Sequence, residues 1–572
     1  MVLPARGLRT VAGGAPPPPG PLGSGGGGAR AGARAAAGLR PLPEPPYAVD
    51  RPGHLRHDRA GSLIADVCGR GWPRGAGRRR GAAAVIQTPA LEFRPILPEI
   101  LLCTFAIVGM LYEAFARRPD PVPHLAIATV GILAAVVSAS ALWHWTGSPY
   151  VMGDTVAVDK FSVVARFVLL GAALVGCLYY AHYGSRDPGS FRGEFYPLTL
   201  FATAGMTLIT AANDLIVIFL ALELLSLSLY VLTGITGRRR ASEAAMKYLL
   251  LGAFSSAFFL YGIAMAYGAA TSTKIVGVAA PGIVQALAGQ TGSRALALLA
   301  MALLVVGFGF KVSAAPFHMW TPDVYQGAPT PVVAFMGAAT KVAAFFALIR
   351  VFDVGLQPLT LDWTPVLYAL AVVSIVVGSV LAIAQRDVKR LLAYSSIAHA
   401  GFILTGLTAA NSTGIRAAMF YLVAYAAVTL GAFGIVMLVS ARGEEQTSLD
   451  AYAGLARRSP GLAALMTVFL LSLAGIPPTA GFIAKVTVFS AAIGAGNWPL
   501  AVIGVVASVV AAYFYLRVIV YMYMREPAEG IESDEGAMPR IAAGVLAAGI
   551  VVLGVFPGIL TGVLEPASIV RW

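Results

Sequence analysis

The residues best suited to proton chemistry in this sequence are lysines that lie inside long apolar stretches. Lys311, Lys341 and Lys485 fall well within such stretches, and Lys247 lies nearer the end of its own. A charged side chain at the centre of a bilayer costs at least about 2.5–3.5 kcal/mol, so ionisable residues there indicate function. The chain has only seven lysines, whereas most of its thirty-four arginines gather in the N-terminal segment, in loops and near the ends of apolar stretches.

Lysine, and not arginine, is the residue type that a proton relay needs. Arginine keeps its proton at any physiological pH, whereas a buried lysine can gain and lose one near neutrality. The acid that matches these lysines is Glu223, in the middle of the apolar segment IVIFLALELLSLSLYVLTG. A nearby lysine would keep this carboxyl ionised, and a change in the strength of that pair would shift the proton affinity of both groups.

Two histidines and three prolines lie close to the deep lysines. His318 and His399 are further relay candidates, because an imidazole can bind a proton near neutral pH. Pro316 follows the first deep lysine, and Pro477 and Pro478 precede the last one. Proline interrupts helical hydrogen bonding, and irregular backbone at membrane depth is tolerated only inside protein or beside water. Both interruptions are therefore expected to be enclosed by protein or to line a water-filled cavity.

Each of these residues also has a simpler interpretation. Lys247 could extend its ammonium group to the interface beside the arginines at 238–240. The deep glutamate and the other lysines could form ion pairs of purely structural value. The histidines could serve packing alone, and the prolines could be kinks of the kind that is common in membrane helices.

Membrane-spanning helices are the elements that must hold these residues. Hydrophobic residues make up 58% of the chain and charged residues 12%, against about 25% charged in soluble domains. A spanning helix needs about 20 apolar residues, and we predict an all-α polytopic membrane protein with about fourteen such helices. The predicted spans are residues 95–116, 122–146, 158–182, 195–212, 213–236, 243–268, 294–319, 328–350, 364–385, 389–410, 415–440, 461–494, 498–524 and 540–562.

The order of the helices and the loop charges predict the topology. Helices four to eight and nine to thirteen are expected to form two inverted five-helix repeats, each with one discontinuous helix. Fifteen Lys and Arg residues lie in or beside odd-numbered loops and five lie by even-numbered loops. Basic residues concentrate in cytoplasmic loops, so both termini are expected on the outer side.

Residues 1–90 differ in composition from the rest of the chain. This segment is rich in Ala, Gly, Pro and Arg, so we expect it to be disordered. It carries most of the net charge of +13, which therefore does not indicate a nucleic-acid partner. Its arginines oppose the charge rule on the outer side, so we expect translation to start further along, near Val85. Residues 95–562 would form the proton-translocating domain and 563–572 a short C-terminal tail.

Cofactor and metal signatures are not found. Cys68, Cys103 and Cys177 have no metal-ligand or disulfide spacing, and the sequence carries no nucleotide, flavin or iron–sulfur motif. We therefore expect no metal or redox cofactor on this chain.

Three blocks of sequence carry a family resemblance. They are KVSAAPFHMWTPDVYQGAPTPVVAFMGAATKVAAF (311–345), RDVKRLLAYSSIAHAGF (386–402) and GIPPTAGFIAKVTVF (475–489). Together they closely resemble the subunit N family of the proton-pumping NADH:quinone oxidoreductase, bacterial complex I, within the antiporter-like membrane subunits. The resemblance covers about 95–562, and the TPDVYQGAPTPV segment is the part most similar to subunit N.

The resemblance implies a role for each deep residue. Glu223 and Lys311 resemble the glutamate–lysine pair of the family's input half-channel, and Lys247 resembles its accessory lysine. Lys341 resembles the central lysine that links the two halves. Lys485 resembles the terminal lysine that faces the exit.

The resemblance also implies surroundings and partners. His318 and His399 would lie on or beside the hydrated central path. The chain would be a fourteen-helix subunit of a translocase in the inner (plasma) membrane, without redox chemistry of its own. NADH, FMN, iron–sulfur clusters and quinone would belong to partner subunits. The partners would be the antiporter-like subunits L and M and the small subunits A, J, K and H, with no nucleic acid.

Other functions stay open at this point. One alternative is a subunit of a multi-subunit sodium/proton antiporter that is not coupled to redox chemistry. A second is a passive membrane scaffold held by structural ion pairs. Within the wider family, another electron donor such as a hydrogenase could also replace NADH.

Overall fold

The computed structural model describes residues 92–116, 120–186, 191–441, 444–527, 530–533, 536–567 and 569–570. The predictions made for residues 1–90, including the disordered segment and the later start of translation, lie outside these residues. Most of the predicted C-terminal tail is described.

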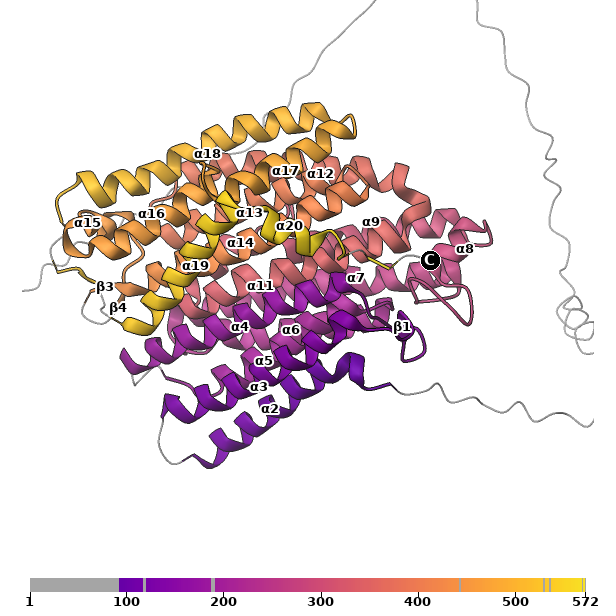
Figure 1. The fold of residues 1–572 in the computed structure, drawn as a ribbon, viewed down its shortest axis with the longest axis horizontal. Coiled ribbons are helices and arrows are strands. Elements are labelled where there is room, and N and C mark those ends of the chain that lie inside the picture. Colours follow the sequence, from indigo (N-terminus) through magenta and orange to yellow (C-terminus); the bar gives the residue numbers. More distant parts are fainter. Residues whose placement is uncertain are drawn as a thin grey trace, which may run out of the picture. The chain divides into compact units, whose positions relative to one another are not determined.

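The described chain is almost entirely helical (Figure 1). The helices of its first half are α2 (Leu97–Phe115), α3 (Pro121–Ala141), α4 (Lys160–Arg186), α5 (Phe195–Ala211), α6 (Leu215–Gly234), α7 (Arg239–Ala270), α8 (Ile283–Ala288), α9 (Arg294–Val312), α10 (Trp320–Gly327) and α11 (Thr330–Ile349). Those of its second half are α12 (Thr360–Ile383), α13 (Val388–Leu407), α14 (Ser412–Leu438), α15 (Leu455–Arg458), α16 (Pro460–Ala474), α17 (Ala480–Gly494), α18 (Trp498–Met524), α19 (Ala537–Val555) and α20 (Gly558–Leu564). Two small antiparallel sheets pair β1 (Tyr150–Val151) with β2 (Val156–Ala157), and β3 (Val439–Ala441) with both β4 (Glu444–Glu445) and β5 (Glu532–Ser533).

Each predicted span overlaps at least one of these helices. This includes the fourth and fifth spans, whose helices are separated only by Ala212, Asn213 and Asp214. The carboxylate of Asp214 caps α6 by accepting a hydrogen bond from the N–H of Ile216 at 2.7 Å. The side-chain amide of Asn213 donates to the carbonyls of Asp154 and Val276, both at 2.7 Å. An N-cap acid and a fully bonded amide fix the turn, so the division between α5 and α6 is confirmed.

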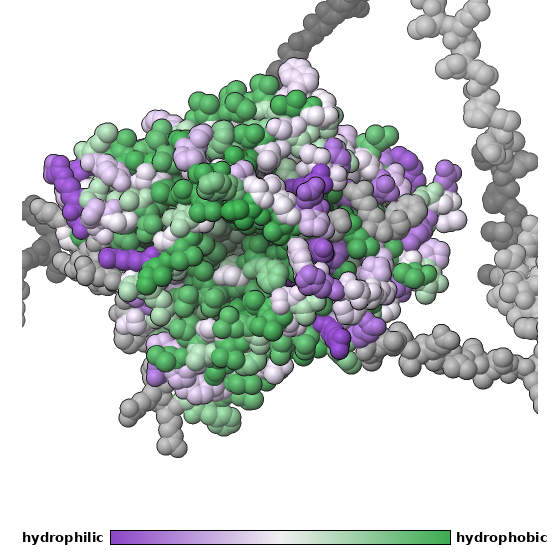
Figure 2. All heavy atoms as spheres, viewed as in Figure 1, coloured by the Kyte–Doolittle hydropathy of each residue, from purple (hydrophilic) through white to green (hydrophobic). Residues whose placement is uncertain are grey.

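Apolar surface is arranged as a membrane protein requires. Figure 2 shows a broad hydrophobic band across the middle of the visible face, with hydrophilic residues gathered toward the ends of the helices. Eleven helices among the described residues are long and apolar enough to cross a membrane, and α5, α16 and α17 are shorter apolar helices. The polytopic all-α class is therefore confirmed, while the number of crossings stays a prediction.

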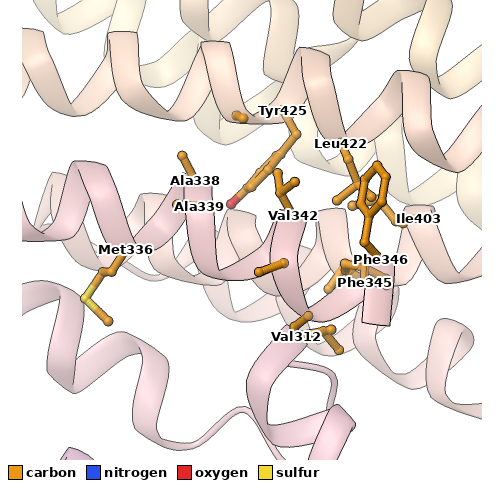
Figure 3. Packing of buried hydrophobic residues seen from close by; sticks show 14 of the residues in the cluster. Val312, Met336, Ala338, Ala339, Val342, Phe345, Phe346, Ile403, Leu422 and Tyr425 are labelled. Carbon is orange, nitrogen blue, oxygen red and sulfur yellow. The ribbon is translucent and has the colours of Figure 1, made fainter. Parts of the chain in front are cut away.

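The centre of the bundle is α11, all of whose residues are buried. It packs against α4, α5, α9 and α14. Figure 3 shows Val342, Phe345 and Phe346 of α11 close to Leu422 and Tyr425 of α14. A polar side chain on α11 is consequently enclosed by protein on every side.

Two predicted spans are interrupted in the same manner. The C-cap residues that follow α9 and α16 are Ser313 and Gly475, both in the left-handed conformation, with φ of 61° and 81°. A cis peptide bond precedes Pro316 in the first break and Pro478 in the second. The chain then starts α10 and α17. The two discontinuous helices were predicted and are confirmed, while the inverted relation of the two five-helix groups stays a prediction.

Candidate functional site

Lys311 occupies the last turn of α9, where α6 and α7 enclose it. Its ammonium group donates a hydrogen bond to the hydroxyl of Ser226 at 2.7 Å. The rings of Tyr230, Tyr248 and Phe310 have their centres 5.7, 5.8 and 5.7 Å from its nitrogen. Aromatic faces attract an ammonium group, so the charged form of this 3% exposed side chain is stabilised by one hydroxyl and three rings.

Glu223 lies on α6, three residues before Ser226, and is half-buried. Its carboxylate accepts a hydrogen bond from the hydroxyl of Ser256 on α7 at 2.5 Å. Residues three apart are neighbours on a helix, so the carboxylate lies one step along α6 from the hydroxyl that holds Lys311. In the described part of the chain, Glu223 and Lys311 do not form an ion pair, and each bonds a different serine. The predicted pair is therefore a pair of neighbours without direct contact.

Lys341 lies in the middle of α11 and is 1% exposed. Its ammonium group donates to the backbone carbonyl of Ser396 on α13. The ring of Tyr425, on α14, has its centre 5.5 Å from the same nitrogen. Three helices thus meet at this lysine, which holds no carboxylate partner among the described residues.

Lys485 lies on α17, just after the second break, and is 5% exposed. Its ammonium group donates to the carbonyls of Leu473 and Ala474 at 3.0 and 2.9 Å. These are the last carbonyls of α16, which have no partner within their own helix, and a positive charge there is favoured by the helix dipole. The ring of Phe402 on α13 lies 5.0 Å from the nitrogen.

His399 lies on α13 between the partners of these two lysines. Ser396, which accepts from Lys341, precedes it by three residues, and Phe402, which faces Lys485, follows it by three. Its ring hydrogen-bonds two tyrosine hydroxyls, and the ring of Phe402 lies 5.8 Å away. The side chain is buried, and it lies on α13 between the residues that contact the two lysines.

Lys247 and His318 lie apart from this group. The ammonium group of Lys247, whose side chain is 44% exposed, forms ion pairs with Glu243 at 2.9 Å and Asp323 at 3.1 Å. His318 is half-buried in the turn between α9 and α10. Among the described residues, neither one hydrogen-bonds Lys311 or another deep lysine. Of the seven candidates, the structure buries Lys311, Lys341, His399 and Lys485, half-buries Glu223 and His318, and leaves Lys247 exposed.

Two buried ion pairs were missed in the sequence. Arg350 at the end of α11 donates to Asp159 at 2.9 Å, and Arg166 on α4 donates to Glu99 on α2 at 3.0 Å. All four side chains are buried. A signal for the second pair existed, because Arg166 interrupts an otherwise apolar stretch. Its partner could not be found, since it lies 67 positions away in the sequence.

No group of three or more His, Cys, Asp and Glu side chains within the described ranges is placed to hold a metal ion. The chemistry of the interior is instead that of amino, imidazole, carboxyl and hydroxyl groups, which bind and pass protons.

Known proteins share this sequence and fold. The family described as "NADH:quinone oxidoreductase/Mrp antiporter, TM" matches residues 212–511. NADH-quinone oxidoreductase subunit N of Rhodococcus opacus is 44% identical over 532 residues, covering 85% of this chain and 96% of that protein. A chain of respiratory complex I from Thermus thermophilus, solved with bound aureothin, is 37% identical and superposes with a TM-score of 0.70, covering 82% of this chain and 100% of that one. A chain of the Mrp complex from Dietzia is 20% identical with a TM-score of 0.70, covering 83% and 97%, and shares the fold.

Proposed function

The chain belongs to the subunit N family of NADH-quinone oxidoreductases, and we propose that it moves protons along its buried line from Glu223 through Lys311 and Lys341 to Lys485. It is a multi-pass membrane subunit of a proton-translocating respiratory complex. Electron transfer from NADH to quinone takes place in other subunits of that complex. The proposal concerns which side chains of this chain carry the proton.

The state of Lys341 and Lys485 supports the proposal most directly. Both are buried, and among the described acidic residues none forms an ion pair with either. A purely structural ion pair, the main rival interpretation, needs such a partner. An unpaired buried ammonium group is costly, and lysine, unlike arginine, can relieve that cost by releasing its proton.

The contacts support this order of the relay. Glu223 lies three residues from Ser226, which bonds Lys311, so a change in the charge of the carboxyl would change the proton affinity of the amine. Lys341 is held by α13, which also carries His399 and the ring that faces Lys485. The helix α13 thus links the central lysine to the terminal one.

Other parts of the proposal concern the edges of the chain and its surroundings. We assign Lys247 an accessory role at the end of α7 and His318 a place beside the central path. Both termini would lie on the outer side of the plasma membrane. The neighbours would be the antiporter-like subunits L and M and the small subunits A, J, K and H. FMN and iron–sulfur clusters would belong to other subunits of the complex.

The test uses the whole complex, purified with this subunit and reconstituted into vesicles. With Lys311→Ala we expect NADH-driven proton uptake and coupled quinone reduction to fall roughly tenfold or more, because a positioned proton carrier is lost. NADH oxidation by an artificial acceptor should persist. Lys274→Ala, which removes a loop lysine 3.6 Å from Asp154, is the control and should pump normally.

Two outcomes would contradict the proposal. Unchanged pumping in the Lys311→Ala complex would remove this residue from the relay. Sodium/proton exchange by the subunit without any electron donor would favour the antiporter alternative.

A further inference from the structure

His399 stands in a row of buried hydroxyl groups that the relay of amines and carboxyl does not use. Its Nδ1 lies 2.6 Å from the hydroxyl of Tyr421 on α14. Its Nε2 lies 3.2 Å from the hydroxyl of Tyr515 on α18. The same Tyr515 hydroxyl hydrogen-bonds the hydroxyl of Ser395 on α13. All four side chains are at most 4% exposed.

We propose that Ser395, Tyr515, His399 and Tyr421 form a proton wire in which the two tyrosines are catalytic relay residues. This inference rests on the proposed function, since it supplies the link between the central and terminal lysines. The wire adds to the proposed relay the hydroxyl groups of Ser395 on α13, Tyr421 on α14 and Tyr515 on α18.

The hydrogen-bond capacities of these groups fit a wire. A neutral imidazole has one nitrogen that donates and one that accepts, whereas a hydroxyl can do both. The row can therefore be fully bonded in one direction, with Ser395 donating to Tyr515, Tyr515 to Nε2, and Nδ1 to Tyr421. It is equally well bonded in the opposite direction. Two arrangements of equal bonding are what a wire needs to pass a proton and be reset.

The transfer balances in protons. A proton binds the oxygen of Ser395, whose own proton moves to the oxygen of Tyr515. The proton of Tyr515 moves to Nε2 of His399, and the proton on Nδ1 moves to Tyr421, which releases its own. One proton enters and one leaves, so no charge stays in the row. Rotation of the hydroxyls and tautomer exchange of the imidazole restore the first direction.

The row lies beside the parts of α13 that contact the two lysines. One end, Ser395, adjoins the residue whose carbonyl holds Lys341. The central member, His399, is three residues before Phe402, which faces Lys485. Ser396 and Phe402 are six residues apart on α13, or about 9 Å along the helix axis. The two lysines therefore contact α13 at well-separated residues, and Ser395 and His399 of the row lie along that part of the helix.

The test replaces hydroxyl groups and keeps the rings. In the reconstituted complex, Tyr421→Phe and Tyr515→Phe should each lower NADH-driven proton uptake and coupled quinone reduction roughly fivefold to tenfold, and the double variant should lower them further. Tyr179→Phe is the matched control, because Tyr179 is a buried tyrosine on α4 outside the row. It should pump as the unaltered complex does.

Further measurements separate a wire from a structural role. Ser395→Ala removes the hydroxyl at the end of the row with little change in volume, and it should also slow pumping. This variant keeps the test decisive if the tyrosine variants assemble poorly. The solvent deuterium isotope effect on coupled turnover should increase in the variants, because proton transfer past the missing hydroxyl group becomes the rate-limiting step. Normal pumping in the double variant and in Ser395→Ala would overturn the wire. If Lys341→Ala and Lys485→Ala also pump normally, the proposed function itself fails. If pumping is lost in the lysine variants but kept in the double tyrosine variant and in Ser395→Ala, only the wire is overturned.

Discussion

The two broken helices hold their lysines in different ways. At the first break the indole N–H of Trp320 donates to the carbonyl of Phe310 at 2.9 Å, so a neutral ring satisfies this end of α9. Lys311 is thereby left to bond Ser226, with Glu223 as its neighbour. At the second break, no aromatic N–H of the described residues donates a hydrogen bond to the last carbonyls of α16. Lys485 itself donates to the last carbonyls of α16.

This difference indicates that the two lysine sites have different roles in proton transfer. The charge of a carboxyl can be switched by one proton, so the first lysine has a partner whose influence can change. The dipole of a helix end is fixed, so the second lysine has a constant partner. The first site is therefore suited to receive the coupling signal, and the second to hold a proton and release it.

The largest effect is expected from the second site. Lys485→Met removes the proton carrier and leaves two carbonyls of α16 unbonded, so we expect proton uptake to fall at least roughly tenfold. Lys485→Arg keeps a cation that can bond the same carbonyls but cannot release its proton. Pumping measured in vesicles should be lost in both variants. Recovery in the arginine variant would mean that Lys485 only caps the helix.

A smaller loss is expected when the switchable partner is fixed. Glu223→Gln keeps an oxygen that can accept from Ser256 and removes the charge. We expect coupled turnover to fall about threefold to tenfold, since Lys311 loses the group that modulates it. Glu526→Gln, on an exposed acid that pairs with Arg457, is the matched control and should have little effect. Equal effects of the two substitutions would remove the distinction between the sites.

The smallest effect concerns the space beside Lys485. A Cβ at Gly475 would lie 2.8 Å from Cδ and 3.2 Å from Nζ of Lys485, so Gly475→Ala should displace the amine. Both this position and Gly237 have positive φ, of 81° and 66°, and each substitution should cost about 1–2 kcal/mol of backbone strain. Around Gly237 nothing lies within 4 Å. Thermal stability should fall alike in both alanine variants, while proton uptake should fall, about twofold, only in the variant at 475.

Much of this arrangement could be predicted from the sequence. The deep lysines stand out because a charge in an apolar stretch is rare, and the prolines mark both breaks because proline interrupts a helix wherever it occurs. Such signals are local, so one sequence is enough to find them. The same holds for Asp214, which caps α6 at the position where the chain must turn.

The partners of these residues could not be predicted in the same way. Ser226, Ser256 and Tyr421 are ordinary residues of membrane helices, and only packing shows which hydroxyl meets which amine. The carbonyls that hold Lys341 and Lys485 carry no side-chain signature at all. Nor could the sequence show that Lys389, counted among the loop charges, has a buried side chain that donates to the carbonyl of Ala328 at 2.6 Å.

The central claim is that the buried amines work by changing their protonation, and Lys341→Gln tests it most directly. Glutamine keeps an N–H donor for the carbonyl of Ser396 and is close to lysine in shape, but it carries no exchangeable charge. In the assembled complex, the number of protons taken up per NADH oxidised should fall, and coupled quinone reduction should slow. An unchanged proton yield at an unchanged rate would contradict the account, because hydrogen bonding alone would then be enough at this position.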